Sequence, residues 1–318
     1  MGIGISLQEY QSISPKTGIR MGLIYHYTSP EGALAILRDK KLWFTDCEYL
    51  NDPAELVYCQ RLINETWGVT TTDPRAAFEN VWSHSDGATI SRKYVLCASG
   101  DGDNVGLWSG FTKNGLKMGY AIGLDEEVLK RAIEPYRDCD DEHCTFDMKI
   151  GPVEYNECVQ RERLNEAKSV FDSKMDSLTE DERSPFSATT KDYEYHLALS
   201  CELNNAMAFM KRPSFRYENE RRVVLEISSE FEGCGSPQSY NVHRGFCPFK
   251  LRYRVGATGI ITPYFEWDFS AYAKQLIKEV HISPAMEADL AKRGMEQFLG
   301  SSGYEDVEVI PSAVRLRF

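Results

Sequence analysis

The sequence lacks the short motifs that mark the commonest enzyme sites. Its 318 residues contain no G-x-G-x-x-G after a strand pattern, no Walker loop, no H-E-x-x-H and no G-x-S-x-G. It also has no internal repeat and no low-complexity tract. The sequence signals of a Rossmann fold, a P-loop nucleotidase, a zinc peptidase and an α/β-hydrolase are therefore absent, and any chemistry must be inferred from less regular patterns.

Long apolar runs and a disulfide framework are also missing. The runs Leu42 to Phe44 and Tyr94 to Ala98 are too short and too interrupted to cross a bilayer. The N-terminal stretch has no basic region followed by an apolar core, so we expect no signal peptide. The 9 cysteines are odd in number and scattered, which argues against disulfides and for a reducing compartment. We therefore expect a cytoplasmic protein without a membrane partner.

The segment CDDEHC, residues 139–144, is the one stretch that resembles a metal site, because Cys139, His143 and Cys144 lie close together. Its spacing matches no standard zinc pattern. An acidic surface loop is the expected structure, and we predict no metal cofactor.

The chain has no net positive charge. The 48 acidic residues exceed the 36 basic ones and give a net charge of −12. Such a chain does not bind nucleic acid through its overall charge, although a local basic patch still can. The basic residues are uneven, and five of them crowd around Glu218 and Glu220: Lys211, Arg212, Arg216, Arg221 and Arg222.

Length and composition are those of a globular protein. A chain of 318 residues, of which 42% are apolar and 26% charged, can bury a sizeable core as one large domain or two small ones. Short strand patterns alternate with irregular helical segments, which favours an α+β fold over a doubly wound one. Strands are expected at 22–28, 93–99, 119–124, 149–155, 222–227, 257–265 and 278–284, and near the C-terminus.

Helical segments have their own signals. Ser29 is expected to cap a helix whose first residue is Pro30, with Leu34 and Leu37 on its apolar face. A further helix is expected around residues 285–298. From about residue 157 to 211 the pattern is again helical, which indicates an insertion carried on a sheet.

The order of several segments resembles a known family. The chain carries, in this order, YHYT, ILRDKKLWFTD, LNDPAE, LCAS, LWSGF, GYAIGL, KRPSFRYENERRVVL and EVHISP, and it closes on SAVRLRF. From about Ile24 to Pro284 this order resembles a bacterial family known only as a domain of unknown function. That family in turn resembles the ADP-ribosyltransferase superfamily. The resemblance implies a single domain over 1–318, in which a split, mixed β-sheet binds NAD in a cleft and a helical insertion occupies about 157–211.

The resemblance also implies roles for three residues. His26 matches the histidine on the superfamily's first strand, and Glu218 and Glu220 match its E-x-E element. Loss of nicotinamide from NAD creates an oxocarbenium-like centre, which a fixed carboxylate stabilises in the transition state. Glu220 would supply this carboxylate, Glu218 would orient or deprotonate the acceptor, and His26 would donate to a ribose hydroxyl. Both carboxylates are expected on one strand face, and an exposed edge strand with arginine partners is the alternative explanation.

Several further residues are expected to contact NAD. The segment LCASGDGDNVGLWSGF is similar to the strand, loop and helix that wall the nicotinamide pocket, although Trp108 and Phe111 depart from the superfamily's usual pattern. One of these two rings is expected to stack on nicotinamide, unless both belong to the core. Tyr27 is a core candidate too, and Asn51 and Asp52 equally fit a turn. The full expected set is His26, Tyr27, Thr28, Asn51, Asp52, Ser99, Trp108, Phe111 and Arg222.

We therefore expect an NAD-dependent ADP-ribosyltransferase, a bacterial toxin or anti-phage effector, with NAD as co-substrate. Lys211, Arg212 and Arg216 are expected to guide a macromolecular acceptor, with RNA or DNA favoured over protein. The net charge of −12 points instead to a protein target, or to an antitoxin partner that neutralises a basic cleft. Two alternatives stay open: an NAD glycohydrolase that uses water at the same site, and a nucleotide-binding module without catalysis.

Overall fold

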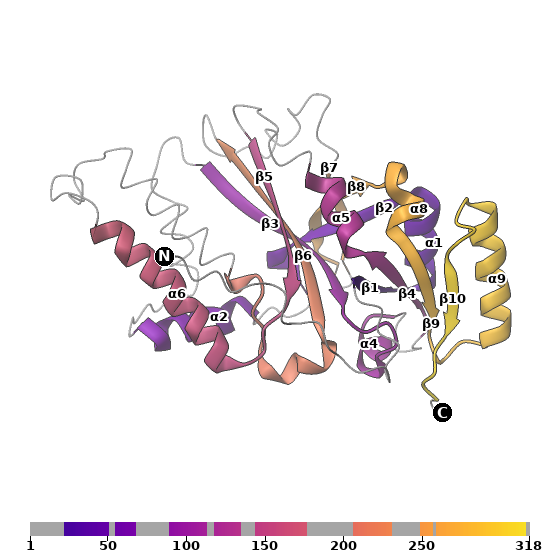
Figure 1. Cartoon of the computed structure of the whole chain (residues 1–318), viewed down its shortest axis with the longest axis horizontal. Coiled ribbons are helices and arrows are strands. Elements are labelled where there is room, and N and C mark those ends of the chain that lie inside the picture. The colour runs from indigo at the N-terminus through magenta and orange to yellow at the C-terminus, as the bar shows by residue number, and fades with distance from the viewer. Residues whose placement is uncertain are drawn as a thin grey trace, which may run out of the picture.

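The computed structural model describes residues 22–50, 55–67, 89–112, 118–134, 144–176, 206–230, 249–256 and 259–315. The strands are β1 (Leu23–Thr28), β2 (Lys41–Asp46), β3 (Thr89–Ser99), β4 (Tyr120–Asp125), β5 (Cys144–Pro152), β6 (Glu220–Glu230), β7 (Phe249–Val255), β8 (Ile261–Asp268), β9 (Ile277–Ile282) and β10 (Glu308–Pro311). They form a ten-stranded sheet in the order β10-β9-β4-β1-β3-β2-β8-β7, and β6 pairs with both β3 and β5 (Figure 1). Strands β9 and β10 are parallel and the other pairs are antiparallel, so the fold is α+β with a mixed, open sheet.

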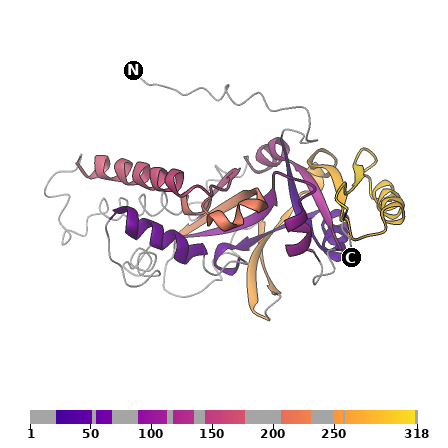
Figure 2. The same cartoon turned by 90° about the horizontal axis from the view of Figure 1, so that it is seen from below.

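Two groups of helices accompany the sheet. The helices are α1 (Pro30–Asp39), α2 (Glu55–Trp67), α4 (Val105–Gly110), α5 (Glu126–Ile133), α6 (Glu157–Asp176), α8 (Ala273–Leu276) and α9 (Ala288–Ser301), with 3-10 turns η1 (Cys47–Tyr49), η3 (Pro213–Glu218) and η5 (Ser270–Tyr272). Helices α1, α5, α8 and α9 add buried side chains to the main core. Helices α2 and α6 lie side by side at the other end of the molecule (Figures 1 and 2) and share a second cluster that includes Leu62, Leu164 and Met210. Among the described residues, no helix is long and apolar enough to span a membrane.

Helix α1 begins where the sequence predicts. The Ser29 hydroxyl accepts a hydrogen bond from the Gly32 N–H at 3.1 Å, and Pro30 occupies the first turn, where its missing N–H costs nothing. Leu37 is fully buried in the main core. Leu34, predicted on the same apolar face, is 44% exposed. The cap fixes the point at which the chain leaves β1 and therefore the position of the end of that strand.

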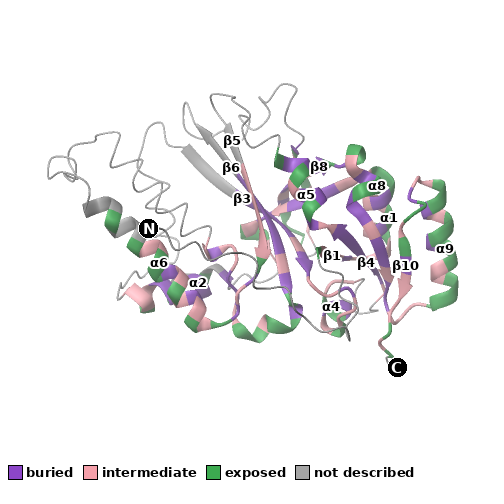
Figure 3. Cartoon of the chain, viewed as in Figure 1, coloured by how far each residue is buried: buried purple, intermediate pink, exposed green. Residues whose placement is uncertain are grey.

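Strand β1 divides its side chains between two clusters. Ile24 belongs to the main core, whereas Tyr25 and Tyr27 pack with Trp108 in a smaller cluster. Figure 3 shows how the buried residues concentrate on the central strands. Because successive strand residues alternate between faces, His26 projects on the same side as Ile24.

Strand β3 changes its partner along one edge. There β1 pairs with β3 at Tyr25–Ser99, whereas β2 pairs with it at Thr45–Val95 and at the next position toward the N-terminus of β3. Residues 96–98 lie between these two contacts. Along its other edge β3 pairs with β6 over its whole length. The sheet therefore opens between β1 and β2. Strand β3, which borders this opening, is fully paired with β6 along its other edge.

Several predicted boundaries need correction. The strand predicted at 257–265 is β8, which begins at Ile261, and residues 257–258 lie outside the described residues. The Gly256 N–H donates to the Ile260 carbonyl oxygen at 2.8 Å, just before β8 begins. The sequence pattern does not predict β7, nor does it predict α2 or α5. The strand predicted at 149–155 is β5, which begins earlier and ends at Pro152. In the predicted insertion, α6 is a helix as expected, and 177–205 lie outside the described residues.

Candidate functional site

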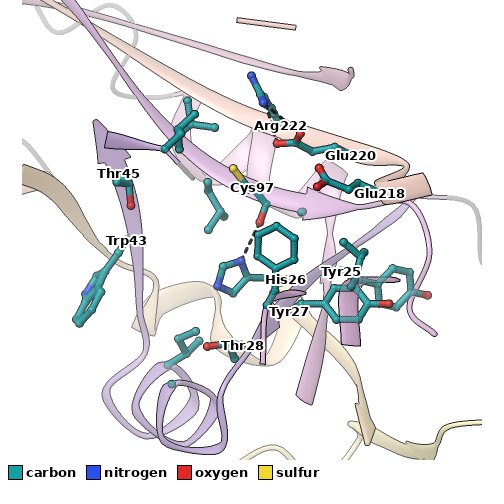
Figure 4. Close-up of a pocket in the computed structure, with 18 of the residues that line it drawn as sticks. Tyr25, His26, Tyr27, Thr28, Trp43, Thr45, Cys97, Glu218, Glu220 and Arg222 are labelled. Carbon is teal, nitrogen blue, oxygen red and sulfur yellow. Dashed lines mark hydrogen bonds and ion pairs between the residues drawn. The ribbon is translucent and has the colours of Figure 1, made fainter. Parts of the chain in front are cut away.

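A cavity of about 520 Å³ lies where β1 and β2 diverge. Its walls come from β1, α1, β2 and β3, from η3 and the start of β6, and from Arg254 of β7 and Glu266 of β8. Small-molecule sites commonly have this volume. Figure 4 shows His26, Cys97, Glu218 and Glu220 around one space, with Trp43 on its far side. Residues that are distant in the sequence therefore meet at one site.

His26 projects from β1 into this cavity. Its Nδ1 lies 2.9 Å from the carbonyl oxygen of Cys97. A carbonyl oxygen can only accept, so Nδ1 carries the ring proton. Burial lowers the pKa of the His26 imidazole and Arg254 adds to this effect, although the bond to Cys97 opposes it. A neutral ring leaves Nε2 as an acceptor, which corrects the prediction that His26 donates to a ligand hydroxyl.

Glu220 is the first residue of β6 and is 5% exposed. Its Oε1 accepts a hydrogen bond from Arg222 Nε at 2.7 Å, and its Oε2 accepts one from Arg222 Nη2 at 3.1 Å. Arg222 also donates to both carboxylate oxygens of Glu55, at 2.6 and 3.0 Å. Arg222 lines the cavity, and there it joins two buried carboxylates.

Glu218 lies in η3 rather than in the strand, which corrects the prediction that the two carboxylates share a strand face. Asn219 separates them in the left-handed conformation (φ 44°), which asparagine tolerates better than most residues. The side chains still converge, because Lys211 Nζ lies 2.6 Å from Glu218 Oε2 and 3.0 Å from Glu220 Oε2. One buried ammonium group therefore holds the two carboxylates together.

We call these five buried residues, Glu55, Arg222, Glu220, Lys211 and Glu218, the charge network. Burial raises the pKa of the Glu218 carboxyl, and the hydrogen bond from Lys211 offsets only part of this shift. Burial acts on Glu220 as well, but Arg222 and Lys211 outweigh it and lower the pKa of that carboxyl. Burial also opposes the charge on Lys211, yet Glu220 and Glu218 raise the pKa of its ammonium group. The charge network thus holds one firmly ionised carboxylate beside one that is easier to protonate.

The loop after β3 holds the turn between the two carboxylates. Ser99 Oγ donates to the Glu218 carbonyl at 2.8 Å, and the Gly100 N–H donates to the Asn219 carbonyl at 2.9 Å. Ser99 is 1% exposed and is not among the described residues that line the cavity. Ser99 was predicted to contact the ligand. The structure instead places it behind the site, where it positions Glu218.

The aromatic candidates separate clearly. Phe111 lines the cavity, whereas Trp108 is fully buried outside its lining. The Trp108 ring packs edge-on against Tyr27, with ring centroids 4.6 Å apart, and its Nε1 donates to Asp103 at 2.8 Å. Tyr27 and Thr28 also line the cavity, although the Tyr27 hydroxyl is already hydrogen-bonded to the loop after β3. Of the two predicted stacking rings, Phe111 is the one that a ligand can reach.

The predicted acceptor residues do not form one track. Lys211 is 7% exposed and lies inside the charge network, so it is not part of an open basic surface. Arg216 is exposed and Arg212 is partly exposed. The Arg212 guanidinium lies over the Phe215 ring, 5.4 Å from its centroid. A polyanion passing this segment would meet two arginines rather than the three cations predicted.

Some residues escape prediction or description. Asn51 and Asp52 lie outside the described residues, as do residues 139–143 of the CDDEHC segment. No local pattern points to Glu55, because its partner Arg222 lies 167 positions along the chain. Tyr155, whose hydroxyl accepts from the Glu220 N–H at 3.0 Å, is hidden for the same reason.

One family of known proteins matches part of the chain. Residues 107–223 match the model of a family described as "Protein of unknown function (DUF2971)". This match confirms the predicted resemblance to a domain of unknown function, and its range includes Glu218, Glu220 and the predicted insertion. No curated protein matches the chain, and no solved structure matches it.

Proposed function

We propose that this protein is an NAD-dependent ADP-ribosyltransferase. One observation carries the proposal: His26 and the pair Glu218 and Glu220 line the same cavity, and the pKa values of the two carboxyl groups are shifted in opposite directions. Two carboxyl groups separated in this way can divide an electrostatic role from a proton-transfer role. ADP-ribose transfer needs this division, because a cationic transition state is attacked by a nucleophile that must lose a proton.

The first half of the reaction is cleavage at the ribose. The bond between ribose C1′ and the nicotinamide nitrogen breaks, and its electron pair leaves with nicotinamide. Glu220, kept ionised by Arg222 and Lys211, stabilises the positive charge that develops on the sugar. Nε2 of neutral His26 accepts a hydrogen bond from a ribose hydroxyl and holds the sugar in place.

Glu218 serves the second half of the reaction. The acceptor atom forms a bond to C1′, and its proton passes to the Glu218 carboxylate. A raised pKa suits this role, because a general base works best when its pKa is near the operating pH. Lys211 still pairs with Glu220 after Glu218 is protonated, so the two carboxyl groups remain together.

The identity of the acceptor decides the biological role and separates the transferase from the alternative enzyme. We further propose that transfer to a macromolecule, with nucleic acid favoured, makes the protein a toxin or anti-phage effector in the cytoplasm. An NAD glycohydrolase is the second candidate, and the position of Lys211 favours it, because this predicted acceptor contact is committed to Glu218 and Glu220. With water as the acceptor, the same residues act and the water proton passes to Glu218.

Product analysis tests the proposal. The protein is incubated with NAD labelled in its adenosine half, together with cellular RNA, DNA and protein, and both nicotinamide release and the label on each fraction are measured. Wild type should label one fraction and Glu220→Gln should not, whereas Glu127→Gln, a glutamate 71% exposed on α5, should behave as wild type. A folded wild-type protein that neither binds NAD at millimolar concentration nor releases nicotinamide would contradict the proposal.

A further inference from the structure

One face of the sheet end formed by β2, β8 and β7 carries a basic and aromatic surface. Directly paired residues of antiparallel strands project on the same side, and the register pairs Trp43 with Glu266 and Thr45 with Tyr264 across β2 and β8. The β7–β8 register pairs Arg252 with Tyr264 and extends the same side onto β7. We call this side the basic-aromatic face, made of Lys41, Trp43, Thr45, Thr262, Tyr264, Glu266, Asp268, Lys250, Arg252 and Arg254.

Arg254 is the central cation of this face. Its guanidinium carbon lies 5.5 Å from the centroid of the Trp43 ring and 5.7 Å from that of Tyr264. Its Nη2 donates to Thr45 Oγ1 at 2.8 Å, which fixes its direction. The two rings themselves lie 4.6 Å apart. Trp43 is 41% exposed and forms the outer ring of this stack, so it presents an indole surface to a ligand.

The charges of this face are incompletely balanced. Glu266 pairs with Lys41 at 2.8 Å and more weakly with Arg252 at 3.9 Å. Asp268 adds a second carboxylate at the end of the face, opposite Lys41. Arg254 forms no ion pair with any described residue, and burial lowers the pKa of its guanidinium because no carboxylate offsets the loss of solvent. In a chain of net charge −12, a half-buried cation that has no carboxylate partner among the described residues indicates an anionic ligand.

The face continues into the candidate site. Trp43, Thr45 and Arg254 line the same cavity as His26 and Glu220. In Figure 4, Trp43 lies across the cavity from Glu220, with His26 between them. A chain-like ligand on the basic-aromatic face therefore leads directly to the carboxylates.

We propose that the basic-aromatic face binds single-stranded nucleic acid, with bases stacked on Trp43 and phosphates held by Arg254 and Arg252. The proposal rests on the proposed transferase function, for which it supplies the acceptor-binding surface. Aromatic rings beside cations are the usual means of holding unpaired strands. Protection of an edge strand accounts for charges on β7, but it does not account for an exposed indole on the internal strand β2.

Binding without NAD tests this surface independently of catalysis. Fluorescence anisotropy with a short labelled RNA single strand, its DNA counterpart and the matching duplex is measured over a range of salt concentrations. We expect single strands to bind more tightly than the duplex, because paired bases cannot stack on Trp43. Trp43→Leu should weaken single-strand binding about 5-fold or more and leave the salt dependence unchanged.

Charge variants make the test specific. Arg254→Gln should weaken binding and reduce the slope of log K against log salt by about 0.7, the value for one phosphate contact on a single strand. Arg252→Gln, whose side chain is 52% exposed, should do the same without affecting the fold. The matched control is Arg293→Gln, an exposed arginine on α9 at the opposite end of the strand order, which should change neither quantity.

The outcomes separate this inference from the proposed function. Equal affinity for duplex and single strands, no binding of either, or an equal loss in Arg293→Gln would overturn the basic-aromatic face as a single-strand site. Labelling of cellular protein by a chain that binds no single strand would overturn it while the transferase function stands. Single-strand binding that depends on Trp43 and Arg254, in a protein that releases no nicotinamide, would support the surface and contradict the transferase.

Discussion

Nδ1 of His26 donates to the carbonyl oxygen of Cys97 at 2.9 Å, at a position of β3 where neither β1 nor β2 completes the strand ladder. The opening of the sheet frees this carbonyl, and the imidazole takes the place of a backbone N–H. The same hydrogen bond fixes the tautomer of His26. The gap between β1 and β2 along the edge of β3 therefore determines which nitrogen of His26 carries the proton.

His26 is predicted to stay neutral, with its proton on Nδ1, when the pH falls below about 6.5, the ordinary pKa of histidine. Its pKa is lowered in the folded state, so the unfolded chain binds more protons as the pH falls. The free energy of unfolding should therefore decrease from about 6.5 down to the folded pKa. Nitrogen NMR shifts report the tautomer, and urea unfolding at several pH values reports the stability. A charged His26 ring at that pH, or an unchanged pH dependence in His26→Gln, would contradict this expectation.

Glu220→Gln should slow nicotinamide release by about 10²- to 10³-fold, because it removes a preorganised charge. NAD affinity should change much less, since the positive charge that Glu220 stabilises is absent in the ground state. Release is measured in single-turnover assays and affinity by calorimetry. Glu127→Gln is the control for loss of a surface carboxylate. Full activity in Glu220→Gln would remove Glu220 from the reaction.

Glu218→Gln should reduce transfer to the acceptor while slow NAD hydrolysis persists, because water still reaches the activated ribose. The wild-type rate of transfer should fall as the pH drops through the raised pKa of Glu218, above the usual value of about 4.3 for glutamate. This acidic limb should be missing from the residual transfer activity of the variant. An unchanged limb in Glu218→Gln would assign the titration to another group.

Lys211→Met should destabilise the fold by about 3–5 kcal/mol, because it leaves two buried carboxylates without their shared cation. The double variant Lys211→Met with Glu218→Gln should lose less stability than the two single changes added together, since one uncompensated charge is gone. Urea unfolding measures all three. Lys274→Met, at a lysine whose side chain is 72% exposed, should stay within about 0.5 kcal/mol of wild type. Simple additivity would mean that Lys211 and Glu218 do not interact in solution.

Local signals predicted the elements that local interactions form. Ser29 and Pro30 place α1 correctly because a helix start depends on the first few residues. Helix α5 is missed although Asp125 caps it and accepts from the Val128 N–H at 3.0 Å, so its signal was present in the sequence. Strand β7 is missed although its basic residues alternate with apolar ones, which is the pattern of a half-buried strand, so its signal was present in the sequence too.

The site was predictable only in part. His26 and Glu220 come from a resemblance, and the structure brings them to one cavity, but the burial of Lys211 follows from tertiary packing. The same holds for Glu55, which reaches Arg222 only when α2 packs beside the start of β6. The residues around a charged side chain in the sequence do not show whether the fold will bury it or leave it in solvent. The roles of Lys211 and Glu55 therefore could not be predicted.

The charge network contains three carboxylates and two cations, so one negative charge is unmatched when every member is ionised. Two events can neutralise it: protonation of Glu218, or arrival of a positively charged ligand beside it. These events compete, so a cation that enters the cavity should lower the pKa of Glu218 and release any proton that this carboxyl group holds. Oxidised nicotinamide carries a positive ring and reduced nicotinamide does not. The cavity wall would therefore discriminate between the two redox forms of one dinucleotide by charge alone.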